Sequence, residues 1–294
     1  DGGDLLLSTL RKTSWDSGHE VRFDQAARRL PGTCHILFPR DLAAALRREL
    51  PPGAIRCNAR VAALEAGAAA LDSGERIAAR TVIDCRGFAQ GEHLSGAWHH
   101  SLGRHLRLPA PHGLPCPVTI DASLEQGGSL RFLSVLPLGA GELLVTDHAL
   151  LPGSRPDRRL ASRRIDAYCA ARGWQEAALL GHETGRRPVI TGGDYPAWQA
   201  GLALPGVVRA GSRGGFLRPL AGQEMGIAAA VALRIAAEAD LPGEQLAALI
   251  AGEARRHWAA NAPERRLAGL LLGSGAGLAP RARLYEQGES LIRR

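Results

Sequence analysis

The chain has 294 residues, of which 45% are hydrophobic and 22% are charged, so it has enough apolar material for one or two folded domains and is not typical of a disordered protein. Its formal net charge is +7, but the arginines are scattered without interleaved aromatic residues, which argues against nucleic acid as a partner. Five widely spaced cysteines without a C-x-x-C pair argue against a metal site or a disulfide framework and favour a reducing, cytoplasmic location. No apolar run approaches the roughly 18–20 residues that cross a bilayer.

The first part of the chain predicts one helix followed by short strands. Apolar residues recur at helical spacing between residues 41 and 50, which predicts a helix there. Short apolar runs bounded by turn residues predict strands at residues 61–64 and 69–71. Residues 80–84 predict a short buried strand that ends before Gly87.

The middle of the chain is rich in strand signals, and the remainder alternates strand, loop and helix. Turns that contain glycine separate three predicted strands, at residues 117–122, 130–136 and 142–147. Residues 158–172 predict a helix that ends at Gly173. A short strand at 207–210 and a glycine-rich loop lead into a long alanine-rich helix predicted at 222–239, and a basic helical region follows from Gly243.

This order of elements predicts an α/β fold in which a nucleotide-binding domain is combined with an antiparallel, β-rich substrate domain. No strand followed by G-x-G-x-x-G stands near Asp1, so we expect the first βαβ unit of such a fold to be missing. The predicted domains are the remainder of the nucleotide-binding domain at residues 1–100, the substrate domain at 101–200, a return to the first domain at 201–242, and a helical region at 243–294.

Three segments have residue types suited to chemistry. A β-branched strand runs into Asp84 and then Gly87, where the backbone can approach a ligand closely or simply turn. The glycine-rich loop at residues 209–222 lies between a strand and a helix, so its N–H groups suit a pyrophosphate or a flavin, or only form the helix entry. An apolar strand ends at Asp147 beside His148, which suits a proton donor with a raised pKa or a carboxylate that caps a turn.

Further short motifs follow one another from about residue 19 to residue 240. They are His19-Glu20-Val21-Arg22-Phe23, Val82-Ile83-Asp84-Cys85-Arg86-Gly87, Pro111-His112-Gly113-Leu114, Asp121-Ala122, Arg131-Phe132, Leu136-Pro137-Leu138, Leu143-Leu144-Val145, Glu183 with Gly185 and Pro188, Gly193-Asp194, and Gly211, Arg213, Gly215, Pro219 and Gly222. In this order they resemble the bacterial-type lycopene β-cyclases. The chain departs from the family at Thr146, where the family has its first acid, and at Arg218, where the family has histidine before Pro219.

The resemblance implies an FAD/NAD(P)-binding, Rossmann-like flavoprotein fold, incomplete at its N-terminus. It implies FAD in its reduced form, with NAD(P)H as the reductant of the flavin. The residues that it assigns to FAD are Asp84, Arg86, Gly87, Gly211, Arg213, Gly215, Pro219 and Gly222. Because the first βαβ unit is expected to be missing, we expect the chain as given to bind FAD weakly or not at all.

The resemblance also implies a redox-neutral, acid-catalysed cyclisation of the ψ-ends of lycopene to β-ionone rings. Asp147 is then the best remaining acid and Glu183 the second candidate. Lycopene or a related carotenoid is the expected substrate, and a peripheral membrane location is expected, with Arg255-Arg256-His257-Trp258 as an interfacial segment. Two alternatives stay open: an FAD-dependent oxidoreductase or hydroxylase on the same scaffold, and a truncated remnant without catalytic activity.

Overall fold

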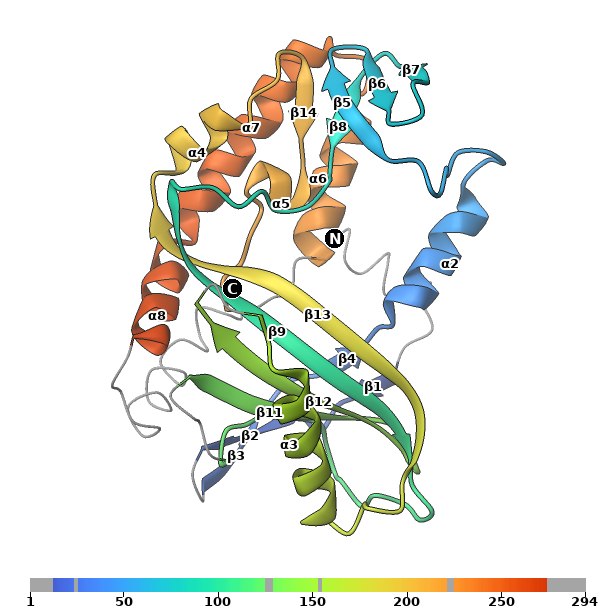
Figure 1. Ribbon diagram of the computed structural model, residues 1–294, viewed down its shortest axis with the longest axis vertical. Coiled ribbons are helices and arrows are strands. Elements are labelled where there is room, and N and C mark those ends of the chain that lie inside the picture. The colour runs from blue at the N-terminus through green and yellow to red at the C-terminus, as the bar shows by residue number, and fades with distance from the viewer. Residues whose placement is uncertain (1–12, 24–25, 125–128, 153–154, 221–224, 274–294) are drawn as a thin grey trace. The chain divides into compact units, whose positions relative to one another are not determined.

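The computed structural model describes residues 13–23, 26–124, 129–152, 155–220 and 225–273 (Figure 1). The chain divides into two compact units. Unit 1 contains Pro39–Ser95 and Ile190–Arg266, and unit 2 contains Arg11–Phe38, Gly96–Val189 and the described residues from Leu267 onward. Each unit is therefore assembled from segments that are distant in the sequence.

Unit 2 is built on a mixed seven-stranded sheet in which the strand order is β13-β9-β12-β11-β10-β2-β3 (Figure 1). The strands of this sheet are β2 (His19–Phe23), β3 (Ala26–Leu30), β9 (Leu94–Arg107), β10 (Val118–Asp121), β11 (Leu130–Gly139), β12 (Glu142–Leu151) and β13 (Ala178–Gly193). Strand β10 pairs with β2 in parallel, and β9, β12, β11 and β10 pair antiparallel in succession. A separate antiparallel pair joins β1 (Thr13–Trp15) to β4 (Cys34–Ile36).

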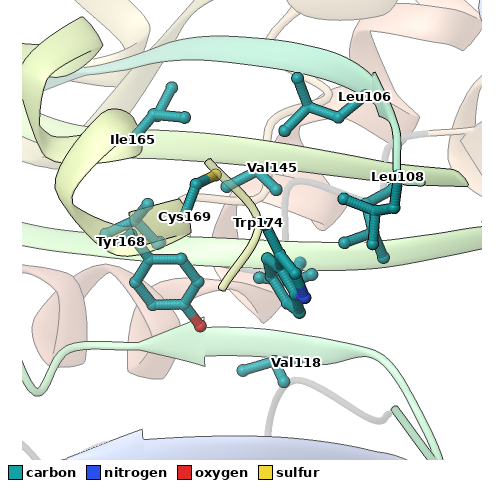
Figure 2. Close-up of a cluster of buried hydrophobic side chains, with 11 residues drawn as sticks. Leu106, Leu108, Val118, Val145, Ile165, Tyr168, Cys169 and Trp174 are labelled. Atoms are coloured by element: carbon teal, nitrogen blue, oxygen red, sulfur yellow. The ribbon is translucent and has the colours of Figure 1, made fainter. Parts of the chain in front are cut away.

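Helix α3 (Arg158–Ala170) covers one face of this sheet and packs against β12. The carboxylate of Asp157 caps the helix, because it accepts hydrogen bonds from the backbone N–H groups of Arg159 and Leu160 at 2.9 and 3.0 Å. Ile165 and Tyr168 on the helix meet the inward face of the sheet, and Figure 2 shows these side chains beside Val145. The full set of buried apolar residues in this core is Leu106, Leu108, Val118, Leu133, Val135, Leu143, Val145, Ile165, Tyr168, Cys169 and Trp174.

Unit 1 contains a parallel pair of strands, β8 (Val82–Asp84) and β14 (Val207–Arg209). A three-stranded antiparallel sheet is formed by β5 (Val61–Glu65), β6 (Ala68–Leu71) and β7 (Arg76–Ala78). The helices are α2 (Pro39–Glu49), α4 (Tyr195–Gly201), α5 (Gly211–Gly214), α6 (Met225–Ala237), α7 (Gly243–Ala260) and α8 (Ala262–Leu272), the last of which ends beyond the unit boundary. Leu246, Ile250 and Ala254 recur every fourth residue and form the buried stripe of α7.

Most elements expected from the sequence are present, but the two longest strands were not predicted. Strands β9 and β13 alternate apolar residues with histidine, arginine and glycine, so neither contains the apolar run by which strands are usually recognised. The long helix predicted to begin at Gly222 is described from Met225 onward, and residues 221–224 lie outside the described residues.

Candidate functional site

Two loops of unit 1 begin at the same edge of the parallel pair β8 and β14. Asp84 and Arg209 are register partners at the carboxyl ends of these strands, and the backbone N–H of Ala210 donates to the carbonyl oxygen of Asp84 at 3.1 Å. The residues that follow each strand therefore leave the sheet side by side. In open α/β sheets, ligands bind outside the carboxyl ends of parallel strands.

Asp84 connects the two loops through arginine side chains. Its carboxylate accepts hydrogen bonds from Nε and a terminal nitrogen of Arg86, both at 2.9 Å, and lies 3.6 Å from Nε of Arg213. Burial acts to raise the pKa of Asp84, but the hydrogen bonds from Arg86 and the charge of Arg213 outweigh it and hold the pKa below its ordinary value. The carboxylate is therefore ionised, and it holds in place two of the residues that the sequence assigned to a cofactor.

The predicted glycines of these loops serve two different purposes. Gly87 and Gly211 have φ values of +85° and +55°, and a Cβ atom at either position would meet nothing within 4 Å. Gly215 also has a positive φ, of +96°, but a Cβ there would lie 2.6 Å from the ring of Tyr195. The backbone at Gly87 and Gly211 is open to a ligand that approaches it closely, whereas Gly215 is required for packing.

The end of the glycine-rich loop is fixed by a residue that sequence reasoning missed. Glu264 of α8 is 3% exposed, accepts a hydrogen bond from the backbone N–H of Leu220 at 2.8 Å, and pairs with Arg218 at 3.1 Å. Pro219 between them is buried. The only sequence signal for Glu264 was an acid in the first turn of a basic helix. Gly222, the last residue assigned to this loop, lies outside the described residues.

The two candidate acids lie in unit 2, and the structure does not bring them together. Successive residues of β12 point to opposite faces of the sheet, so Asp147 lies on the face covered by α3. Asp147 is 2% exposed, accepts a hydrogen bond from Nε of Arg164 at 2.7 Å, and lies 3.6 Å from Arg131. Burial raises the pKa of Asp147, as expected, and the opposing influence comes from Arg164 and Arg131. His148 has no part in this opposition, because it lies on the other face of the sheet.

Glu183 shares a face of the sheet with Thr146, the position at which the resemblance places the first acid of the family. Both residues flank Gly103: a Cβ atom on Gly103 would lie 2.8 Å from Oγ1 of Thr146 and 3.5 Å from Cβ of Glu183. Thr146 is buried, whereas Glu183 is exposed on β13. This is the face of the sheet opposite α3.

The same face holds a chain of hydrogen bonds that sequence reasoning missed. Nε of Arg187 donates to Nδ1 of His99 at 2.8 Å, so the tautomer of His99 carries its proton on Nε2 and donates to Nδ1 of His148 at 2.9 Å. His148 then carries its proton on Nε2 and donates to Oγ of Ser134, also at 2.9 Å. Phe132 stacks on the ring of His148, with 4.5 Å between the ring centroids.

The two histidines linked by these hydrogen bonds, His99 and His148, are neutral near pH 7. Burial, followed by the charges of His148 and Arg187, lowers the pKa of His99 to about 2. Burial and the charge of Arg187 lower the pKa of His148 to about 3. The face therefore presents neutral imidazole rings in fixed tautomers between one guanidinium and one hydroxyl group.

Within the described ranges, no group of three or more histidine, cysteine or acidic side chains is arranged to hold a metal ion. No helix in those ranges combines the length and the apolar character needed to cross a membrane. Trp258, predicted to lie at a membrane interface, instead stacks on Tyr195 with centroids 4.8 Å apart, and the guanidinium of Arg265 covers its ring. Arg255 and Arg256 remain exposed.

Comparison with known sequences gives one family. The family described as "Lycopene cyclase protein" matches residues 2–273. A lycopene beta-cyclase from Pseudescherichia vulneris is 33% identical over 257 residues, which cover 87% of this chain and 66% of that protein. A lycopene beta-cyclase from Pantoea ananas is 32% identical and covers 82% of this chain and 62% of that protein. The chain thus spans slightly under two thirds of the length of these relatives.

Solved structures share the fold at low sequence identity. HpxO of Klebsiella pneumoniae, solved with FAD and uric acid, has a TM-score of 0.57 and 15% identity, with 99% of this chain and 81% of that chain covered. The peptidyl tryptophan dihydroxylase QhpG has a TM-score of 0.57 and 17% identity, with 97% of this chain and 66% of that chain covered. The Rossmann-like flavoprotein fold expected from the sequence is therefore confirmed.

Proposed function

This chain belongs to the lycopene cyclase family. We propose that it functions as a lycopene β-cyclase-like enzyme of carotenoid biosynthesis. The reaction is a redox-neutral isomerisation: a ψ-end alkene of lycopene gains a proton, the tertiary carbocation closes a six-membered ring, and a proton leaves to give the β-ionone ring. The observation that carries this proposal is the family match over residues 2–273. The lycopene beta-cyclases that the chain resembles support the same substrate.

We infer that the cofactor is FAD, held at the carboxyl ends of β8 and β14. The open backbone at Gly87 and Gly211 fits a flat ring or a phosphate that comes close to the main chain. Nε of Arg213 lies 3.6 Å from the carboxylate of Asp84, which holds the guanidinium of Arg213 beside both loops. FAD in its reduced form would supply negative charge near the carbocation, with NAD(P)H keeping it reduced and no net transfer of electrons.

For the proton donor, the geometry favours Glu183 over Asp147. Glu183 lies on the same face as Thr146, next to the space left by Gly103. Burial raises the pKa of Asp147, but its carboxylate is already engaged by two guanidinium groups on the opposite face of the sheet, under α3, and is not free to meet an alkene. Glu183 therefore carries the proton to the alkene, and Asp147 organises the arginines around it.

We also propose a cytoplasmic protein that works at a membrane surface, since a C40 hydrocarbon stays within the bilayer. Arg255 and Arg256 are exposed on α7 and can meet anionic headgroups. Trp258 has no part in this proposal, because its ring is packed against Tyr195.

The test is β-carotene formation in a lycopene-accumulating host. The chain would be expressed as a chimera with the portions of the Pantoea ananas relative that lie outside the matched region. We expect Glu183→Gln to lower the β-carotene yield by about a hundredfold or more, the lower end of the range for general acid catalysis. Glu176→Gln, at an exposed acid elsewhere in unit 2, is the matched control.

The products separate the proposal from its alternatives. An isomer with the mass of lycopene indicates cyclisation. A product that has gained oxygen or lost hydrogen indicates a redox enzyme, and unchanged lycopene with a folded, FAD-loaded chimera indicates a protein without this activity. Full activity in the Glu183→Gln variant would exclude Glu183 as the donor.

A further inference from the structure

Unit 2 contains a cavity of about 490 Å³ on the α3 face of its sheet, away from Thr146 and Glu183. The cavity lies where the first turn of α3 meets β9, β12 and β13. Its size falls within the range of small-molecule sites. Neither the cofactor site in unit 1 nor the proposed proton donor uses it.

The floor of the cavity is polar and buried. It includes His100, Arg131 and Asp147, which are 4%, 8% and 2% exposed. Three further guanidinium groups line the cavity nearer to solvent, those of Arg155, Arg158 and Arg186. We call the whole cavity the arginine pocket.

The charges of the arginine pocket are not balanced within its lining. Four arginines face two carboxylates, so the lining has a formal net charge of +2. Both carboxylates are already engaged: Asp147 pairs with Arg164 and Arg131, and Asp157 accepts the first backbone N–H groups of α3. In the part of the chain that the structure describes, no carboxylate pairs with the outer arginines.

One of these outer arginines is also held in place before any ligand arrives. The guanidinium of Arg186 lies 3.7 Å from the centroid of the Trp98 ring. Stacking on an aromatic face fixes the plane of the group while its N–H donors stay available. A positioned guanidinium loses less conformational entropy on binding than a freely moving side chain.

We propose that the arginine pocket binds a phosphate group through Arg155, Arg158 and Arg186. Guanidinium groups bind phosphate through paired, charge-assisted hydrogen bonds, and several of them together suit the double charge of a phosphate monoester. The cavity is larger than a phosphate ion, so it has room for the polar group to which the phosphate is attached. That group belongs either to a soluble phosphate ester or to a lipid headgroup.

The first experiment is a calorimetric titration of the 294-residue chain with inorganic phosphate at constant ionic strength. We expect saturable binding that Arg158→Gln and Arg186→Gln each weaken about tenfold. Arg158→Lys keeps the charge but loses the paired donors, so it should also weaken binding. Arg163→Gln, at an exposed arginine of α3 outside the cavity, is the control and should bind as the parent chain does.

A second measurement needs no variant and therefore does not depend on the folding of one. Phenylglyoxal modifies accessible arginines, and mass spectrometry locates the modified positions. Phosphate should protect Arg158 and Arg186 but not Arg163. Equal modification of all three positions with and without phosphate would overturn the proposal, as would a titration without saturation or one weakened equally by Arg163→Gln.

Vesicles distinguish the two sources of phosphate. Sedimentation with phosphatidylglycerol vesicles should decrease in Arg158→Gln and Arg186→Gln, and be competed by free phosphate, if the pocket holds a lipid headgroup. Vesicle binding that is unaffected by these variants, together with saturable binding of free phosphate, assigns the pocket to a soluble ester. Vesicle binding that is unaffected by the variants, without binding of free phosphate, would remove the site altogether.

Discussion

The two faces of the seven-stranded sheet hold buried polar groups in opposite ways, although they share the same strands. On the α3 face, Asp121 and Asp147 are ionic, and each has at least two basic partners. On the opposite face, His99 and His148 are neutral rings whose tautomers are set by Arg187. Asp147 and His148 are neighbours in β12, yet they belong to these two different arrangements because they lie on opposite faces of the sheet.

The difference shows what each face can do. Removal of one partner from an ion pair buried under a helix leaves the other charge uncompensated, which destabilises the fold. The ion pairs of the α3 face therefore hold arginines in place and contribute to the stability of unit 2. Neutral rings can be uncovered or can face an apolar molecule without the desolvation cost of an ion. The face with Thr146 and Glu183 therefore suits a hydrocarbon substrate better than the α3 face does.

Removal of the charge at Asp121 should have the largest effect. Asp121 is fully buried and accepts hydrogen bonds from the hydroxyl of Tyr168 at 2.9 Å and from Arg172 at 3.1 Å. Asp121→Asn should lower the free energy of unfolding by about 3–5 kcal/mol, because it removes a fully buried anion from two partly buried arginines. Urea unfolding followed by tryptophan fluorescence measures this difference.

The control for this prediction is Asp166, also paired with an arginine but 60% exposed at its side chain. Asp166→Asn should cost less than about 1 kcal/mol, as for other exposed pairs. Equal losses from Asp121→Asn and Asp166→Asn would show that burial does not distinguish them, and the contrast between the faces would lose its basis.

The opposite face predicts a dependence of stability on pH. The pKa values of His99 and His148 are lowered to about 2 and about 3, whereas the unfolded chain has ordinary values near 6.5. The unfolded state therefore binds more protons below about pH 6.5, so stability is lost as the pH falls through this range. Between pH 7 and pH 5 each histidine should contribute a loss of up to about 2 kcal/mol.

A variant isolates this contribution from that of the other titrating groups. His148→Phe removes one of the two imidazoles and keeps a ring against Phe132, so the loss of stability between pH 7 and pH 5 should become smaller. His182→Gln changes an exposed histidine of the same unit and should leave the loss unchanged. A pH dependence that is the same in all three proteins would show that the rings titrate normally.

The sequence predicted those features of the fold and site whose residues follow one another closely along the chain. The glycine-rich loop and the end of β8 were predicted because strand, glycine and helix follow one another within a few residues. The link from Asp84 to Arg213 joins residues far apart in the sequence, and only the parallel pairing of β8 and β14 brings them together. Composition could not predict that pairing.

The same reason explains why the sequence could not rank the two candidate acids by their surroundings. Period-2 alternation places Thr146 and Asp147 on opposite sides of a strand, but it does not say which side α3 covers. The partners of Asp147 come from β11 and α3, and the polar chain on the other face combines residues of β9, β11, β12 and β13. His99 and Arg187 gave no signal because they are 88 residues apart in the sequence, and only the pairing of β9 with β13 brings them together.

The smallest expected effect concerns Thr146, and it tests whether its face is the catalytic one. Thr146→Glu places a second carboxyl group beside Glu183, across the space left by Gly103. Two neighbouring carboxyl groups cannot both ionise easily, so one of them should keep its proton at a higher pH and become a better acid. We expect the chimera with Thr146→Glu to form β-carotene a few-fold faster, with activity that extends to higher pH.

The control variant Thr146→Gln has nearly the same shape without the acid and should give no gain. Asp147→Asn should lower activity because it releases the arginines that Asp147 holds. Equal gains from Thr146→Glu and Thr146→Gln would mean that side-chain volume, and not the proton, is what this position contributes to the reaction.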